Sequence, residues 1–207
     1  VNVLRVHQLY MLPAAEVADK ETREKFGMQT RFRIHPKTVF PYQVFGETFY
    51  APEIDEICVG TNTMSFEDYL DCRQLTMVLE IFYNNGIFRE LFGFLRNREC
   101  SISDFIMRAF EEMKRPDSPL RELFDGFIKE NYECWEREED LLEFLRQPGV
   151  VDRYLDGELG NNEQQMYRAM AIFHHIDDLH RIAFDLAAEI LQAKGVFGEG
   201  ERQYLKE

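Results

Sequence analysis

Asp177 and His180 are the residues whose types and spacing come nearest to a chemical site in this chain. They stand three positions apart in what the apolar pattern predicts to be a long helix over residues 163–193. At 100° per residue, both fall on the apolar face of that helix, one turn apart. A carboxylate and an imidazole there could form an acid–base pair, or a metal site completed by another helix. The apolar face comprises Met166, Met170, Phe173, Phe184, Ala187 and Leu191.

The simpler interpretation of Asp177 and His180 is structural. A buried carboxylate that bonds to an imidazole fixes the packing of a helix without doing chemistry. Bundles that bind metals usually supply a Glu-x-x-His motif from a second helix, and this sequence has none. We therefore favour a buried structural pair, with the metal site as the alternative.

The four cysteines stand at positions 58, 72, 100 and 134, separated by gaps of 14, 28 and 34 residues. None of these gaps is that of a metal knuckle or a redox pair. Reduced, mostly buried thiols of a cytoplasmic protein are the expected state. The chain shows no charged-then-apolar leader and no run of eighteen apolar residues. We therefore expect neither secretion nor a membrane span.

The formal net charge is −14 at pH 7. Phosphate backbones and anionic membrane surfaces repel such a chain, so we expect no nucleic-acid partner and no membrane partner. One local exception is the alternating set Arg31, Arg33, His35 and Lys37. Side chains of a strand alternate between two faces, so we interpret this set as the solvent-facing side of a strand.

Residues 1–64 carry short β-type runs and one helical stretch. The apolar patterns predict strands over 3–12, 29–34 and 54–59. Between the first two, the Ala-, Glu- and Lys-rich stretch 14–25 predicts a short helix that ends at Gly27. This region is expected to be a small α/β segment.

From Ser65 onward the pattern is helical, and each helix has one apolar stripe that a bundle would bury. The predicted fold is mainly α, with a bundle of about five to six helices preceded by the small α/β segment. We expect an α/β region at 1–64, a helical accessory domain at 65–197 and a flexible tail at 198–207. The phenylalanines expected in the core are those at 88, 92, 105, 110, 124 and 127.

Four short motifs follow one another in the first half of the chain. They are Met-Leu-Pro-Ala-Ala-Glu at 11–16, Thr-Arg-Glu-Lys-Phe-Gly at 22–27, Thr-Met-Ser-Phe-Glu-Asp at 63–68 and Glu-Ile-Phe-Tyr-Asn-Asn-Gly at 80–86. This ordered set, within residues 3–110, resembles the segment just downstream of the catalytic barrel in cobalamin-binding-type radical S-adenosylmethionine (SAM) enzymes. Ala14 stands where the family's Leu-Pro-Gly-x-Glu-like turn has glycine, which reaches positive φ more easily.

The resemblance implies that residues 1–64 finish or leave the barrel and that the helices pack outside it. Leu12, Pro13 and Glu16 would then lie at a turn near the end of the barrel. The parent enzyme would hold a [4Fe–4S] cluster and S-adenosylmethionine, with cobalamin as a further candidate cofactor. No CxxxCxxC occurs here, so we expect no cofactor in this fragment and transfer no catalytic residue. A start at Val1 without Met fits a chain cut from a longer protein, or a processed product.

The function expected from the resemblance is a non-catalytic accessory domain that packs on or caps the barrel of its own parent enzyme. Two alternatives stay open. One is an acidic helical module that binds a partner or forms a homodimer. The other is a small metal-binding bundle that uses Asp177 and His180.

Overall fold

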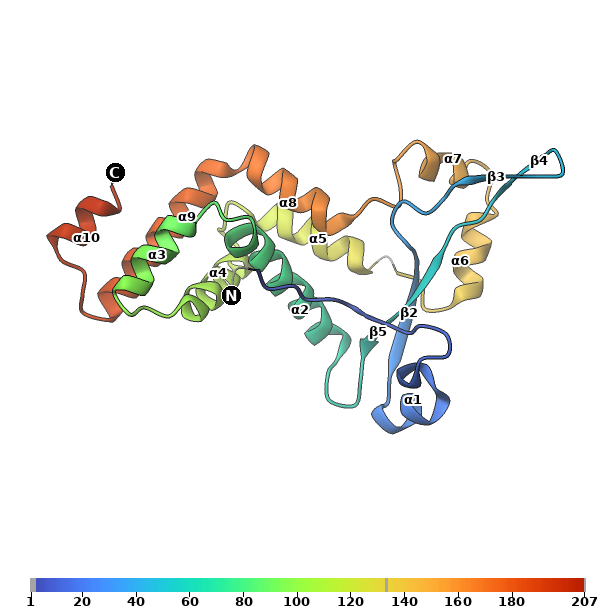
Figure 1. Ribbon diagram of the computed structural model, residues 1–207, viewed down its shortest axis with the longest axis horizontal. Coiled ribbons are helices and arrows are strands. Elements are labelled where there is room, and N and C mark those ends of the chain that lie inside the picture. Colours follow the sequence, from blue (N-terminus) through green and yellow to red (C-terminus); the bar gives the residue numbers. More distant parts are fainter. Residues whose placement is uncertain (1–2, 133, 207) are drawn as a thin grey trace. The chain divides into compact units, whose positions relative to one another are not determined.

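The computed structural model describes residues 3–132 and 134–206. It is mainly helical, with short strands confined to the first 60 residues, which confirms the predicted fold class (Figure 1). The chain divides into two compact units, each drawn from separate stretches of sequence. We call residues 7–72 and 129–166 the sheet unit, and residues 1–6, 73–128 and 167–207 the helical unit. These units do not follow the boundary expected near residue 65.

Three antiparallel strands form the centre of the sheet unit, in the order β1-β5-β2. Their bounds are Leu9–Tyr10 for β1, Gln29–Ile34 for β2 and Ile54–Gly60 for β5. The predicted strands at 29–34 and 54–59 are thus confirmed, whereas only two residues of the stretch 3–12 pair as a strand. Helix α1 (Lys20–Phe26) follows a 3-10 turn and ends at Gly27, where φ is 57°. Glycine suits that left-handed position, as the sequence predicts.

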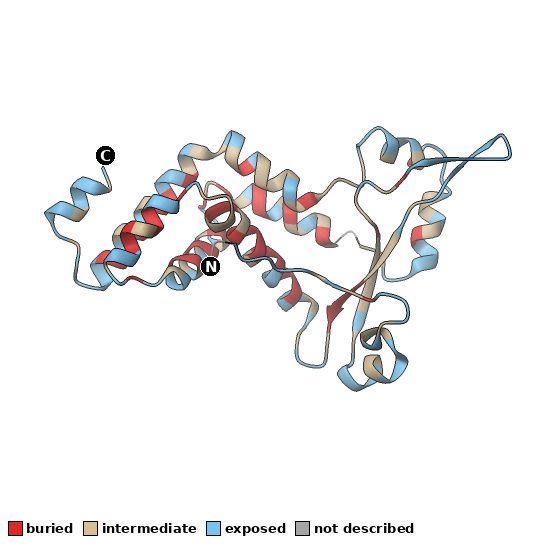
Figure 2. Ribbon diagram, in the orientation of Figure 1, coloured by how far each residue is buried: buried red, intermediate tan, exposed pale blue. Residues whose placement is uncertain are grey.

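A two-stranded hairpin, β3 (Pro41–Val44) and β4 (Glu47–Tyr50), was not predicted from the sequence. Both of its faces carry large apolar side chains, so it lacks the apolar–polar alternation that marks a half-buried strand. Every residue of both strands is exposed (Figure 2).

Helices α6 (Glu138–Leu145) and α7 (Val150–Leu155) complete the sheet unit. A small core forms where α6 packs against β2, around the buried side chains of Ile34, Val39 and Leu141. The backbones of Phe32 and Trp135 exchange two hydrogen bonds of 2.7 and 2.9 Å, which tie the segment before α6 to β2. The short strands therefore gain a second apolar surface from a stretch a hundred residues away.

Helices make up most of the helical unit, and three helices, α2 (Phe66–Val78), α5 (Arg121–Tyr132) and α8 (Glu163–His174), begin in one unit and end in the other. Ser101 caps α4 through its hydroxyl, which accepts from the Asp104 amide. The helices are α2 (Phe66–Val78) with a π-helical continuation (Leu79–Asn84), α3 (Arg89–Asn97), α4 (Ile102–Lys114), α5 (Arg121–Tyr132), α8 (Glu163–His174), α9 (Ile176–Ala193) and α10 (Glu199–Tyr204).

Aromatic rings dominate the core of the helical unit. The six phenylalanines that the sequence placed in the core are all buried, which confirms that prediction. Phe92 and Phe105 meet edge to face with ring centroids 5.0 Å apart, and Phe82 meets Phe105 at 6.2 Å. Such contacts add about 0.5–1.5 kcal/mol each beyond the burial of area. The core thus joins α2 and its π-helical continuation, α3 and α4 through one set of rings.

One prediction for the C-terminal part is wrong. The long helix expected over 163–193 breaks at His175, where φ is −129° and ψ is 23°, so α8 ends at His174 and α9 begins at Ile176. The last residues include α10, whose Tyr204 ring stacks on Phe94 with ring centroids 3.9 Å apart, and the flexibility expected for residues 198–207 stays a prediction. Tail residues thus cover an apolar side chain of α3.

No helix within the described residues is both long and apolar enough to cross a membrane.

Candidate functional site

Asp177 and His180 do not lie on a buried face. Both side chains are exposed, so the prediction that they face the core is wrong. The break at His175 changes the phase of the helix, and Asp177 falls in the first turn of α9. An acidic residue there is stabilised by the positive end of the helix dipole. Ala187 and Leu191 are buried as expected, and the buried side of α9 comprises Leu179, Ile182, Ala183, Leu186, Ala187, Ile190 and Leu191.

His180 lies against aromatic rings. Its ring centroid is 5.4 Å from that of Phe88 and 6.2 Å from that of Phe184. These side chains line an open apolar hollow of about 300 Å³, together with Ile87, Glu90, Leu91 and Tyr204. Among the described residues, no group of three His, Cys, Asp or Glu side chains is placed to hold a metal ion. The metal site at Asp177 and His180 stays a prediction.

The turn at Leu12, Pro13 and Glu16 has the geometry that its sequence suggests. The Ala15 amide donates to the Leu12 carbonyl at 3.1 Å, which closes a β-turn. Ala14 adopts φ 64° at the position where a type II turn requires positive φ. Leu12, Pro13 and Glu16 are exposed. The turn therefore has a glycine-type conformation at an alanine.

The motif around Arg23 contacts the sheet directly. Its guanidinium forms two parallel hydrogen bonds to the Glu56 carboxylate of β5, at 2.5 and 2.7 Å. The hydrogen bond from Arg23 lowers the pKa of Glu56, and a hydrogen bond from Thr30 adds to the effect. Bidentate pairs of this kind fix geometry as well as supplying energy. Arg23 thus clamps α1 to the central strand.

Arg33 is the centre of the most connected polar cluster in the sheet unit. Its side chain is only 15% exposed, and its two terminal nitrogens donate to Glu163 at 2.8 Å and to Gln8 and Tyr10 at 3.0 and 3.2 Å. Its Nε has no hydrogen-bond acceptor in the described part of the chain, although Asp55 lies 3.6 Å away. Burial is the largest single effect on the pKa of Arg33 and lowers it, but the charges of Glu163 and Tyr10 and the hydrogen bond to Glu163 act together in the opposite direction, and the pKa is raised.

His35 extends the same cluster toward solvent. Its Nδ1 lies 2.9 Å from the Asp55 carboxylate, and the imidazole is 44% exposed whereas Asp55 is 14% exposed. A carboxylate that holds Nδ1–H leaves Nε2 free to accept a proton or bind a ligand. The geometry of His35 therefore permits acid–base chemistry.

The cluster around Arg33 corrects the interpretation of residues 31–37 as a solvated strand face. Arg31 is 19% exposed and its guanidinium stacks over the Phe66 ring at 4.0 Å. Arg33 stands directly opposite Asp55 in the pairing of β2 with β5. The position of Arg33 across from Asp55 on the neighbouring strand is the signal that the sequence analysis missed. Once both strands are predicted and aligned antiparallel, an arginine falls beside an aspartate.

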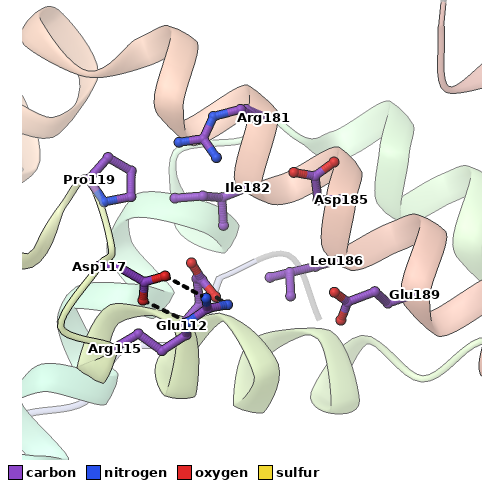
Figure 3. A pocket seen from close by; sticks show the side chains of 9 residues that line it. All are labelled: Glu112, Arg115, Asp117, Pro119, Arg181, Ile182, Asp185, Leu186 and Glu189. Atoms are coloured by element: carbon purple, nitrogen blue, oxygen red, sulfur yellow. Dashed lines mark hydrogen bonds and ion pairs between the residues drawn. The ribbon is translucent and has the colours of Figure 1, made fainter.

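A polar hollow of about 240 Å³ lies within the helical unit (Figure 3). Arg181, Asp185 and Glu189 extend into it from α9, and Glu112 and Arg115 face them from α4 and the residue after it. Arg115 bonds to Glu112 at 2.9 Å and to Asp117 at 2.8 Å. The hydrogen bond from Arg115 lowers the pKa of Asp117. Glu112, Arg115 and Asp117 are thus paired with one another on one side of the hollow.

The cysteines do not fit an iron–sulfur cluster. Cys58 and Cys100 are buried, and their thiols donate to the carbonyls of Gly60 and Arg98 at 3.3 and 3.7 Å. A thiol that donates a hydrogen bond carries its proton, whereas a metal ligand must be a thiolate. Comparison of the sequence with protein-family models and with curated proteins finds no match.

Proposed function

We propose that this chain is a non-catalytic accessory region of a cobalamin-binding-type radical SAM enzyme, and that it packs on or caps the barrel of its own parent chain. Contacts among the motifs that resemble that family are the observation that supports the proposal. The strand before the turn at 11–16 is bonded to β5, since the Met11 amide donates to the Glu56 carbonyl at 2.8 Å. Arg23 of the second motif holds the side chain of the same Glu56.

The second and third motifs meet as well. The Asn62 amide, just before the third motif, donates to the Phe26 carbonyl at 2.8 Å. At the adjoining Gly27, an added Cβ would lie 3.4 Å from Asn62. Motifs 35 residues apart in sequence thus form one connected local structure around β5. A common structural role gives a reason for their fixed order, which supports the resemblance.

The direction of the strands favours one form of the proposal. Strands in a βα barrel run parallel, whereas β1, β5 and β2 are antiparallel to their neighbours. Residues 9–60 are therefore better suited to a segment that leaves the barrel than to strands that complete it. In this proposal the turn at Leu12 and Pro13 marks the exit, and the chemistry belongs to residues upstream.

The genomic reading frame tests the proposal most directly. We expect the frame to continue upstream of Val1 and to encode a CxxxCxxC motif in the same polypeptide. An antibody raised against this chain should then detect a native polypeptide well above 24.6 kDa. A start codon immediately before Val1, or turnover of a small molecule by the isolated 207-residue chain, would defeat the proposal.

A further inference from the structure

The β3–β4 hairpin is an exposed apolar arm of the sheet unit. Two-stranded hairpins have little stability by themselves, and contiguous exposed apolar surface usually marks an interaction site. Within the described residues no third strand pairs with this hairpin. Its exposed large apolar side chains are Phe40, Tyr42, Val44, Phe45, Phe49 and Tyr50.

The tip of the hairpin is strained. Phe45 and Gly46 form its two-residue turn with φ values of 51° and 84°. Turns of this kind favour Asn-Gly, because a bulky residue at positive φ costs about 1–2 kcal/mol. The Phe45 side chain is also fully exposed, at 104%. The positive φ of Phe45 and the exposure of its apolar ring are both unfavourable in free energy, which points to a role in contact with a partner.

The two edges of the hairpin differ in what they can pair with. Val44 and Glu47 close the two-residue turn, so the hydrogen-bonded pairs are 44–47 and 42–49. The backbone groups of Pro41 and Gln43 on β3, and of Thr48 and Tyr50 on β4, therefore point outward. Pro41 has no N–H, which blocks part of the β3 edge. The β4 edge keeps all of its donors and acceptors.

Charge favours a second copy of this chain as the partner. Residues 40–52 carry one charged side chain, Glu47, in a chain of net charge −14. The hairpin is thus a surface on which two acidic copies can approach with little repulsion. It offers no Lys or Arg between residues 40 and 52 to attract an anionic membrane or a nucleic acid.

We propose that β4 pairs antiparallel with β4 of a second copy about a two-fold axis at Phe49. In this register the two Phe49 rings lie opposite each other, and Thr48 of each copy exchanges backbone hydrogen bonds with Tyr50 of the other. Glu47 stands opposite Ala51, so like charges stay apart. Four residues a side bury far less than the roughly 1,600 Å² of a standard interface. The dimer is therefore weak, with a dissociation constant on the order of 10⁻⁵ to 10⁻³ M.

Charge variants at the axis test the symmetry of this interface. Sedimentation velocity on the 207-residue chain should show reversible, concentration-dependent dimerisation. Phe49→Glu and Phe49→Lys should each weaken it about tenfold or more, because like charges then meet across the axis. An equal mixture of the two variants should associate at least as tightly as the unchanged chain, since opposite charges meet. This pattern of association arises only if residue 49 of one copy lies opposite residue 49 of the other copy.

Proline variants identify the edge. Gln43 and Thr48 share one side-chain hydrogen bond of 2.8 Å, so a change at either position removes the same contact. Thr48→Pro should abolish dimerisation by deleting an outward N–H of β4. Gln43→Pro, the matched change on β3, should leave it unaltered. Hydrogen exchange should show protection of the Thr48 and Tyr50 amides that grows with concentration.

Several outcomes would overturn the proposal. They are a monomer at about 1 mM, equal effects of the two proline variants, or a mixture of charge variants that fails to associate. Binding of phosphatidylcholine vesicles by a monomer, lost in Phe45→Ser, would assign the hairpin to a lipid surface instead and reject the dimer.

Discussion

Arg33 is a cation that the surrounding carboxylates keep inside the sheet unit. Glu163 bonds to it at 2.8 Å and Asp55 lies 3.6 Å from its Nε, and both acids are mostly buried. Buried charges of this kind stabilise a fold only when all of them are present, because each charge needs an opposite charge beside it. Removing one member leaves its partners buried without compensation.

Arg33→Met should therefore destabilise the protein by about 3–5 kcal/mol. Urea unfolding followed by circular dichroism measures this change. The double variant Arg33→Met with Glu163→Met should recover a large part of the loss, because the uncompensated carboxylate is removed as well. Additive losses in the double variant would show that the two side chains do not act as a pair.

The backbone of Ala14 is strained because the residue carries a Cβ methyl group. Its φ of 64° is a conformation in which Cβ crowds the backbone. Ala14→Gly should raise the free energy of unfolding by about 0.5 kcal/mol, the relief of strain less the added entropy of the unfolded chain.

The neighbouring Ala15→Gly is the matched control for Ala14→Gly. Ala15 has φ −81° and ψ 139°, an ordinary extended conformation. That change should lower stability by about 0.4–1 kcal/mol, since only the entropy term remains. The same sign for both variants in a urea titration would contradict the argument.

Glu56 links stability to pH through Arg23. The hydrogen bond from Arg23 depresses the pKa of Glu56 in the folded protein below its ordinary value of 4.5. The stabilisation is thus fully present above about pH 4.5 and is lost as pH falls through the lower, folded pKa. Glu56→Gln should cost about 1–3 kcal/mol at pH 7, and this difference should shrink toward pH 3.

Urea unfolding at several pH values between 7 and 3 measures the contribution of Glu56. The exposed Glu53 precedes the same strand, and Glu53→Gln should stay within about 0.5 kcal/mol of the unchanged protein. A difference between Glu56→Gln and the unchanged protein that is constant with pH would argue against the ion pair as its source.

At the scale of elements, α9 shows how a break alters every residue after it. Two adjacent histidines, neither of them a strong helix former, precede Ile176, and no Gly or Pro marks the site. His175 leaves the helical conformation, and a different side of α9 then faces the core. Met170 and Phe173 of α8, which were also expected on the core face, are exposed.

Helix α10 is held by specific contacts with α3. Tyr204 stacks on Phe94 with ring planes 6° apart, and Glu201 bonds to Arg98 at 3.0 Å. Tyr204→Ala should remove the stacked ring and speed hydrogen exchange of the backbone amides of residues 199–204 about tenfold or more. Lys206→Ala, at an exposed position just after the helix, is the control and should leave exchange nearly unchanged. Fast exchange throughout 199–204 in the unchanged protein would support the predicted flexible tail.

At the scale of the whole molecule, the excess of acidic over basic residues opposes compaction. A net charge of −14 creates self-repulsion, while exposed ion pairs contribute at most about 1 kcal/mol each. Raising NaCl from about 10 to 300 mM shortens the Debye length from about 30 Å to below 10 Å. Thermal unfolding temperature should therefore rise by a few degrees at pH 7.

Differential scanning calorimetry measures the salt effect, and the isoelectric pH provides the control. Near pH 4.8 the net charge approaches zero, so the same increase in NaCl should leave the unfolding temperature unchanged or lower it slightly. A fall in unfolding temperature with NaCl at pH 7 would mean that attractive ion pairs outweigh the net repulsion.

Local signals predicted much of the fold. Gly27 ends α1, Ser65 and Asp68 bond to each other at the start of α2, and Asn84 to Gly86 end its π-helical continuation. Such signals act through hydrogen bonds within a few residues, so they can be recognised in any sequence window. The apolar stripes of α3 and α4 predicted their buried sides for the same reason.

The sequence by itself determined the helical class, the aromatic core and the acidic surface, because periodicity, side-chain volume and charge are properties of short segments and of composition. Only the tertiary structure decided that Arg33 is buried beside Asp55 and Glu163, and that Asp177 and His180 are exposed. Those outcomes depend on which distant segments pair and on where one helix breaks. The energies that settle such pairings come from contacts between residues up to 130 positions apart, which no local pattern contains.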